Sequence, residues 1–258
     1  MPPVFEAINL NYSYGKIAAL NGLNLTIDEG ERLAFVGANG SGKSTLLRLL
    51  DALYFPSSGQ LTYRAVPLTE QRFDDEPFAL QFRRDVALVF QNPDVQLFCP
   101  TVYDEIAFGP LQLNWPKEQI ISKVSETLDL LQISHLAQRI PHHLSGGEKK
   151  KVALASALIL DPKIILLDEP AAALDPRSQM QIIDFLIEWG SKSKTIVTAT
   201  HDLHTLEDIA DKCIVFEQGA IIASGTPHDI LHDHDLLQRS NLMHSHRRSR
   251  VSGHIHLP

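Results

Sequence analysis

The sequence predicts an α/β fold in which helices cover both faces of a parallel sheet. Short apolar runs at residues 33–36, 164–167 and 195–198 are typical of buried strands. A predicted helix follows the first run, and another separates the last two, with apolar residues at positions 180, 183, 185, 186 and 189. Alternating strands and helices require crossover connections, which favour a parallel sheet between helical layers.

The N-terminal third adds further strands to this core. Residues 4–36 are interpreted as short strands, and residues 59–63 and 86–90 form two more, with a polar loop at 74–76. Glycine placement predicts three turns, at Tyr14-Gly15, Asn21-Gly22 and Glu29-Gly30.

Residues 92–160 are interpreted as a helical insert. Ile120, Val124, Leu128 and Leu131 recur at helical spacing, and a second helix is predicted from about residue 148 to 160. Strands at 213–216 and 220–223, joined by a turn at Gln218-Gly219, close the regular pattern as a hairpin.

The composition limits the functional class. The 258 residues carry a formal charge of −8 with no run of five or more like charges, which argues against a dedicated nucleic-acid-binding protein. No stretch approaches the ~20 apolar residues that span a bilayer, and the N-terminus does not resemble a signal peptide. Two cysteines, Cys99 and Cys213, are too few for a disulfide framework, so we expect a reducing, cytoplasmic location.

A phosphate-binding loop lies between the first core strand and its helix. The run satisfies the complete glycine-lysine pattern, and its residues are Gly37, Ala38, Asn39, Gly40, Ser41, Gly42, Lys43, Ser44 and Thr45. Glycines let backbone N–H groups surround phosphate oxygens, and the helix adds its positive end. Lys43 is expected to reach the β- and γ-phosphates of ATP, and Ser44 to bind Mg²⁺.

Two adjacent carboxylates end the strand at 164–167. Asp168 is expected to hold Mg²⁺, directly or through water, and Glu169 to orient or deprotonate an attacking water. An acidic turn in solvent is the alternative when this pair is taken alone. Its combination with the phosphate loop favours the catalytic interpretation.

A second anion-binding site is predicted before the helix near residue 148. Its residues are Leu144, Ser145, Gly146, Gly147 and Glu148, which offer a hydroxyl, open backbone N–H groups and a helix N-terminus. With this motif the chain resembles the ABC (ATP-binding cassette) ATPase family from about residue 5 to 225. The signature matches except at its fifth residue, where Glu148 replaces the usual glutamine.

The resemblance implies a fold, an activity and a dimer. The fold is a P-loop NTPase cassette with a RecA-like parallel core, an N-terminal antiparallel β subdomain and a helical subdomain. The ATP-binding domain spans residues 1–225, with its helical subdomain at about 92–160, and a histidine-rich tail covers 226–258. Two ATPase subunits pack head to tail, so the residues 144–148 of one cover the γ-phosphate held by the other.

Other positions match the family residue by residue. Tyr14 resembles the aromatic residue that stacks on adenine, although a structural tyrosine is the alternative. Gln91 resembles the glutamine that touches Mg²⁺ and the water, and Asp175 lies in the loop that faces the partner. His201 resembles the histidine that contacts the γ-phosphate. Every expected catalytic residue is present, so a homodimer of this chain has two competent sites; a heterodimer stays open.

The segment 91–110 resembles the ATPases of energy-coupling-factor (ECF) transporters, prokaryotic importers of vitamins and of cobalt or nickel ions. The resemblance implies a membrane scaffold subunit, a substrate-binding membrane subunit and a place on the cytoplasmic face of the cell membrane. Four apolar residues are expected to wall a groove for a scaffold helix, unless they pack the helical insert: Leu97, Phe98, Val102 and Phe108.

The C-terminal tail suggests the cargo. Its imidazoles suit Ni²⁺ and Co²⁺, which favours cobalt or nickel over vitamin import, while a polar tail that binds nothing is the alternative. The histidines are His228, His232, His234, His244, His246, His254 and His256. Lys149–Lys151 after the signature form a small basic patch whose partner the sequence does not identify.

Three other functions are alternatives to an ECF-type importer. DNA-repair or translation ABC ATPases carry coiled-coil or zinc inserts, or two cassettes, and this chain has one cassette and no CxxC pair. Another importer class would keep every catalytic motif and differ mainly at residues 91–110. A module that holds ATP without turnover conflicts with Glu169 and His201.

Overall fold

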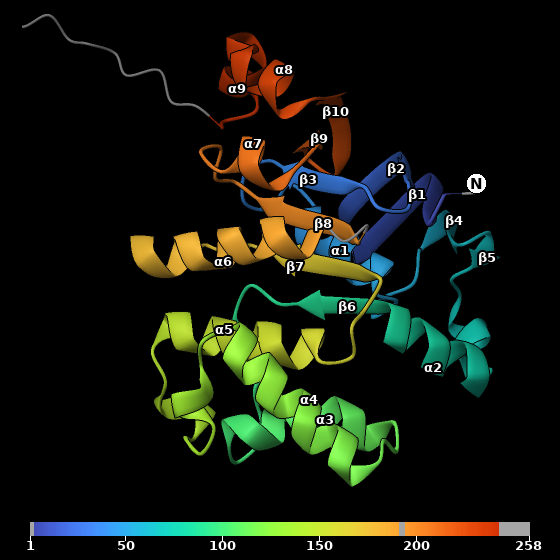
Figure 1. Ribbon diagram of the computed structural model, residues 1–258. Coiled ribbons are helices and arrows are strands. Elements are labelled where there is room, and N and C mark those ends of the chain that lie inside the picture. Colours follow the sequence, from blue (N-terminus) through green and yellow to red (C-terminus); the bar gives the residue numbers. More distant parts are fainter. Residues whose placement is uncertain (1–2, 191–193, 243–258) are drawn as a thin grey trace, which may run out of the picture.

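The computed structural model describes residues 3–190 and 194–242 (Figure 1). A six-stranded sheet forms its centre, in the order β10 (Ala220–Gly225), β9 (Lys212–Glu217), β3 (Arg32–Val36), β8 (Thr195–Thr200), β7 (Ile164–Asp168) and β6 (Val86–Val89). All neighbours pair in parallel except the β9–β10 hairpin. The expected parallel core and closing hairpin are therefore confirmed.

A second, antiparallel sheet packs on one face of this core. Its strand order is β2 (Ile17–Ile27), β1 (Phe5–Tyr14), β4 (Ser58–Tyr63) and β5 (Val66–Pro67). Leu33 and Phe35 of β3 point toward this sheet and toward α1 (Lys43–Leu50), whose leucines are fully buried between the two sheets. The antiparallel β subdomain implied by the family resemblance is present.

The opposite face of the parallel sheet carries the helical part. Ile165 and Leu167 of β7 point that way, because successive side chains of a strand alternate between faces. They pack with α3 (Val102–Gln112), α4 (Lys117–Leu130), α5 (Gly146–Leu158) and α6 (Pro176–Gly190). Figure 1 shows α3, α4 and α5 gathered below the sheet, so the predicted helical insert is confirmed.

Two local predictions were wrong. Asn21-Gly22 is not a turn but a bulge inside β2, where Gly22 has φ 58° and its N–H donates to Asn11 Oδ1 of β1 at 2.8 Å. The polar loop at 74–76 is the junction between a 3₁₀ turn (Glu70–Asp74) and α2 (Glu76–Asp85), which buries Phe82.

The folded body continues past Gly225, which the sequence did not indicate. Helix α8 (Pro227–His232) begins with a Thr226–Asp229 capping box, and α9 (His234–Arg239) follows it. Ile230, Leu236 and Leu237 pack with α7 (Leu206–Ile209) and with Ala34 and Val36 of β3. The first part of the histidine-rich segment is therefore attached to the sheet.

Within residues 3–190 and 194–242, no helix is long and apolar enough to cross a membrane.

We expect Leu237→Ala to lower the free energy of unfolding by about 2–5 kcal/mol, because it opens a cavity in a fully buried position. Gln238→Ala, an exposed neighbour on the same helix, is the control and should change stability by less than about 0.5 kcal/mol. Urea denaturation of both variants checks this. Equal stabilities would show that α9 contributes nothing to the fold.

Candidate functional site

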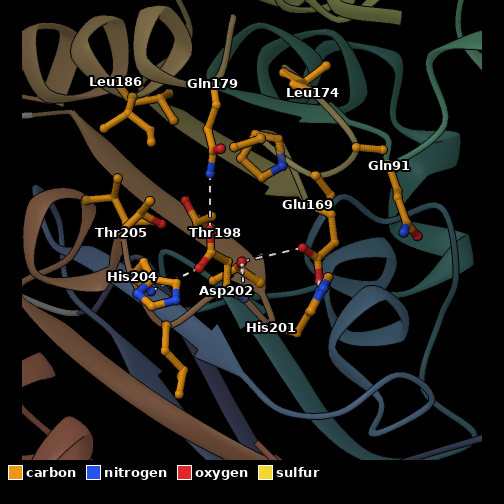
Figure 2. Close-up of a pocket in the computed structure, with 18 of the residues that line it drawn as sticks. Gln91, Glu169, Leu174, Gln179, Leu186, Thr198, His201, Asp202, His204 and Thr205 are labelled. Atoms are coloured by element: carbon orange, nitrogen blue, oxygen red, sulfur yellow. Dashed lines mark hydrogen bonds and ion pairs between the residues drawn. The ribbon is translucent and has the colours of Figure 1, made fainter. Parts of the chain in front are cut away.

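A pocket of about 1120 Å³ opens beside the carboxyl ends of the central strands (Figure 2). Gln91, Glu169 and His201, which follow β6, β7 and β8, line its polar side. Leucines of α6, α8 and α9 line the other side. Strand ends of a parallel sheet meet at one edge, so the fold itself collects these polar groups.

The phosphate loop follows β3 at the same edge. Gly40 and Gly42 have φ values of 81° and 109°, and a Cβ on Gly42 would lie 2.8 Å from the Ala19 carbonyl oxygen. Only glycine fits this position without strain. The loop therefore turns its backbone toward the N-terminus of α1, as a phosphate-binding loop requires.

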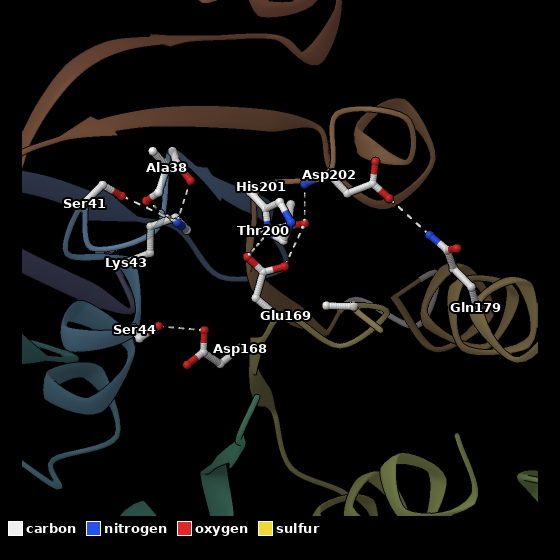
Figure 3. A network of polar contacts seen from close by, with 12 residues as sticks. Ala38, Ser41, Lys43, Ser44, Asp168, Glu169, Gln179, Thr200, His201 and Asp202 are labelled. Carbon is white, nitrogen blue, oxygen red and sulfur yellow. Dashed lines mark hydrogen bonds and ion pairs between the residues drawn. The ribbon is translucent and has the colours of Figure 1, made fainter. Parts of the chain in front are cut away.

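Lys43 is buried, and its ammonium group lies inside the loop. Its Nζ donates to the carbonyl oxygens of Gly37 at 2.6 Å and Ala38 at 3.1 Å (Figure 3). Burial lowers the pKa of Lys43, and the nearby carboxylates of Glu169 and Asp168 oppose that shift. The loop carbonyls thus hold a cation at the place where the sequence predicts phosphate oxygens.

Ser44 and Asp168 lie together, as predicted for a Mg²⁺ site. The Ser44 hydroxyl donates to Asp168 Oδ1 at 2.8 Å, and Asp168 is 4% exposed. Burial raises the pKa of Asp168, while the Ser44 hydrogen bond and Arg48 oppose the shift. A hard-oxygen pair of this kind fits Mg²⁺, which binds through one or two carboxylates, phosphate oxygens and waters.

Glu169 and His201 form a close pair. His201 Nδ1 lies 2.7 Å from Glu169 Oε1, and Thr200 Oγ1 lies 3.4 Å from Oε2. Glu169 is buried and has φ 51°, an unusual conformation for a residue with a side chain. Its backbone N–H donates to the Ala199 carbonyl at 2.9 Å, which anchors the strained residue to β8. Strained backbone of this kind clusters at functional sites.

The signature residues lie elsewhere in the chain. Ser145 caps α5, whose side chains pack on the sheet face opposite to α1. The Ser145 N–H and hydroxyl both donate to Glu148 Oε2 at 2.8 Å, and these bonds lower the pKa of the Glu148 carboxyl. The residue that departs from the family pattern therefore completes a capping box. One chain does not bring its signature and its phosphate loop to the same sheet face.

Tyr14 is compatible with both interpretations given above. Its ring is 40% exposed and meets the rings of Tyr12 and Tyr54 edge-on, at 5.0 and 5.9 Å. Its hydroxyl lies 3.3 Å from Thr45 Oγ1, so the ring stands beside the phosphate loop. Adenine stacking stays a prediction.

Asp175 has a role within its own chain. Its Oδ1 accepts the N–H groups of Arg177 and Ser178 at 3.1 Å, and Oδ2 accepts the Ser178 hydroxyl at 2.6 Å. These bonds, that of the Ser178 hydroxyl foremost, lower the pKa of Asp175. The carboxylate thus caps the start of α6, and its contact with a second subunit stays a prediction.

The four apolar residues of the segment 91–110 that were expected to wall a groove or to pack the helical insert divide into two pairs. Leu97 and Val102 are buried in the core of the helical part and do not line a surface. Phe98 and Phe108 are exposed, and their rings meet edge-on at 4.9 Å. The sequence missed Glu105, a buried carboxylate that accepts the N–H groups of Phe98 and Cys99 at 2.8 and 2.7 Å and so fixes the loop.

Three histidines of the predicted tail, His228, His232 and His234, lie in α8 and α9. His228 and His232 lie one helical turn apart, with ring centroids separated by 4.0 Å, and His232 Nδ1 lies 2.8 Å from the His228 carbonyl oxygen. Over residues 3–190 and 194–242, no three His, Cys, Asp or Glu side chains are arranged to hold a metal ion. His244, His246, His254 and His256 lie outside the described residues.

The basic patch at Lys149–Lys151 is not a free surface. Lys149 pairs with Asp94, Lys150 is buried against backbone carbonyls, and Lys151 donates to Gln181. Three consecutive lysines gave no sign of burial in the sequence.

The chain is similar to known proteins of ABC transporters. A profile described as "ABC transporter" matches residues 20–172. The nickel import ATP-binding protein NikO of Rhodobacter capsulatus is 51% identical over 94% of this chain and 97% of its own. The energy-coupling factor transporter ATP-binding protein EcfA2 of Methanospirillum hungatei is 41% identical over 94% of this chain and 60% of its own. The solved structure of cbiO1 from Clostridium perfringens, part of the ABC transporter complex cbiONQ, superposes with a TM-score of 0.78 at 33% identity, over 94% and 96% of the two chains.

We expect Asp168→Asn to raise the melting temperature of the nucleotide-free protein at pH 7.5. The folded state binds the Asp168 proton more tightly than the unfolded chain, so wild-type stability falls as pH rises through the window above the ordinary carboxyl pKa. Asparagine does not ionise, so the stability of the variant does not fall in this pH window.

Thermal scans at several pH values check this expectation. The gap between variant and wild type should shrink toward pH ~4, where the unfolded carboxyl also holds its proton. Asp74→Asn, an exposed carboxylate, is the control and should give no such trend. A gap that is independent of pH would contradict the electrostatic explanation.

Proposed function

This chain belongs to the ABC transporter family of ATP-hydrolysing subunits, and from that premise we propose that it energises import by an ECF-type membrane complex, with cobalt or nickel ions as cargo. One observation carries the ATPase part: Lys43, the Ser44–Asp168 pair and the Glu169–His201 pair converge at one edge of the parallel sheet. The names of NikO and of the cbiONQ complex support the cargo. A vitamin importer of the same type is the alternative.

ATP binds with its phosphates in the loop 37–45 and its adenine beside Tyr14. Loop N–H groups, the N-terminus of α1 and Lys43 neutralise the β- and γ-phosphates. Ser44, Asp168 and Gln91 would hold Mg²⁺, which would supply positive charge against the charge that develops on the phosphates during hydrolysis.

Hydrolysis requires a positioned water. Its oxygen attacks the γ-phosphorus opposite to the bridging oxygen, which leaves with ADP, while Glu169 Oε accepts the water proton. His201, 2.7 Å from Glu169, orients that carboxylate and contacts the γ-phosphate. Gln91 lines the same pocket and senses the water. Positioning and electrostatics of this kind supply most of phosphoryl-transfer catalysis.

The second half of each site comes from another subunit. The backbone N–H groups of Gly146 and Gly147 and the Ser145 hydroxyl cap the partner's γ-phosphate, with Leu144 and Glu148 shaping the loop and Asp175 facing the interface. The separation of α1 and α5 across the sheet supports this arrangement. Two copies of this chain then bind two ATP molecules.

The membrane is reached through other subunits. A scaffold subunit contacts the helical part near the exposed Phe98–Phe108 pair, and a substrate-binding subunit selects the cargo. The ATPase thereby sits on the cytoplasmic face of a prokaryotic cell membrane and has no nucleic-acid partner. The ATP-binding unit spans 1–225, with the helical subdomain at about 92–160, and α8 and α9 pack against it.

We expect Glu169→Gln to reduce kcat for ATP by about 100-fold or more while ATP still binds, because the proton acceptor is lost and the phosphate contacts remain. Steady-state hydrolysis and equilibrium binding of a fluorescent ATP analogue separate the two effects. Glu118→Gln, an exposed glutamate of α4, is the matched control. Equal rates in wild type and Glu169→Gln would contradict the assigned role.

The same variant identifies the transporter. Tagged Glu169→Gln chain, trapped with ATP and purified from gently solubilised membranes, should retain a scaffold subunit and a membrane subunit that binds cobalt or nickel. A vitamin-binding subunit in its place would keep the importer and refute the metal cargo. Recovery of soluble proteins or nucleic acid alone would refute transport.

A further inference from the structure

The N-terminal half of α5 is attached to the loop that carries Glu169. Lys150 Nζ donates to the backbone carbonyl oxygens of Glu169 and Ala172, both at 2.7 Å. One residue further on, Lys151 Nζ donates to Gln181 Oε1 of α6 at 2.7 Å. At Gly147, a Cβ atom would lie 2.9 Å from Ser178 Oγ, so the two helix ends are in close contact. Contacts at three positions of α5, residues 147, 150 and 151, thus link its signature end to the segment 169–181.

Lys150 is the unusual member of this set. It is 8% exposed, and apolar side chains of Leu154, Leu167 and Ile182 lie around it. Burial lowers the pKa of its ammonium group, and the charges of Glu169 and Asp168 oppose that shift. A buried ammonium is costly, and two backbone carbonyls offset only part of the cost. A methionine of similar length would pack there without that cost.

The two carbonyls that Lys150 holds define the loop after β7. The first belongs to Glu169, whose φ of 51° is strained and therefore needs support from its surroundings. The second belongs to Ala172, three residues on and next to Ala173, which has φ 60°. A single ammonium group fixes both ends of this turn, and with them the direction of the Glu169 side chain.

We infer that Lys150 is a positioning residue that couples the two ATP sites of the dimer. When the signature of one chain contacts the partner's nucleotide, Lys150 of that chain transmits the contact to Glu169 in the chain's own ATP site. This rests on the proposed function, in which Ser145 and Gly147 act on the partner's ATP. Ser145 and Lys150 are five residues apart on one helix, about 7.5 Å along its axis. Movement of the helix end therefore displaces the Glu169 carbonyl directly.

The test measures ATP hydrolysis by full-length chain as a function of ATP concentration. Wild type should show a Hill coefficient clearly above 1, up to about 2 for two coupled sites. Lys150→Met should reduce kcat by roughly 10- to 100-fold, because small displacements of a catalytic group cost that much, and should bring the Hill coefficient to about 1. Affinity for the fluorescent ATP analogue should change less than about twofold, since the phosphate loop is untouched.

Two further variants exclude a merely structural effect. Lys149→Met removes the neighbouring lysine of the same helix, which pairs with the exposed Asp94 and not with the 169–172 loop, and should leave kcat and the Hill coefficient unchanged. Lys150→Arg keeps a cation with several donors and should recover part of both values. If Lys150→Met does not fold, Lys150→Gln, a neutral donor, takes its place in the comparison.

The outcomes are distinct. Loss of cooperativity and kcat with retained ATP affinity supports the coupling. Two results would overturn the coupling and leave the ATPase activity intact. One is a folded Lys150 variant with the kcat and Hill coefficient of the wild type, and the other is a wild-type Hill coefficient of about 1. A wild-type chain that does not hydrolyse ATP even with its membrane partners refutes the proposed function, and the coupling with it.

Discussion

The parallel pairing of β3, β7 and β8 is the constraint on which the site depends. Register places Val36 beside Thr200 and Asp168 beside Ala199, so the loops that follow all leave the sheet at one edge. Ser44 and Asp168 are 124 residues apart in sequence, and Glu169 and His201 are 32 apart. These side chains meet only because the β3–β8 and β7–β8 ladders are aligned. A slip of one residue in β7 would turn Asp168 to the opposite face of the sheet.

That edge gathers charges that the interior does not favour. Lys43 and Asp168 are both buried. Burial lowers the pKa of Lys43 and raises the pKa of Asp168, and both shifts favour the neutral form of the group. Glu169 adds a buried carboxylate on a strained backbone. In the proposed function, bound nucleotide and Mg²⁺ would supply the opposite charges that these groups need. ATP binding is then coupled to order in the surrounding loops, including the one that Lys150 holds.

Local patterns made the core of the site predictable. The phosphate loop and the signature each lie within nine residues or fewer, so their glycines and helix starts can be read directly from the sequence. The strand-end carboxylates follow an apolar run that forms β7 in the structure, whereas the role of His201 is implied by the family resemblance. The features that were missed depend on distant partners: the Gly22 bulge on Asn11, the burial of Lys150 on the 169–172 loop, and the fold of α8 and α9 on β3. For Leu97 and Val102 the sequence leaves both a groove wall and the interior of the insert open, because an apolar residue looks the same in sequence whether it faces a partner or its own core.

If each ATP site is shared between two copies of the chain, mixed dimers of two inactive variants should regain activity. Lys43→Ala disables the phosphate loop and Ser145→Arg disables the signature, so each variant alone should be inactive. In a dimer with one copy of each, one shared site carries both defects and the other carries neither. Each mixed dimer should therefore recover up to about half of the wild-type activity, and a 1:1 mixture with random pairing up to about a quarter. Mixtures as inactive as the separate variants would contradict shared sites.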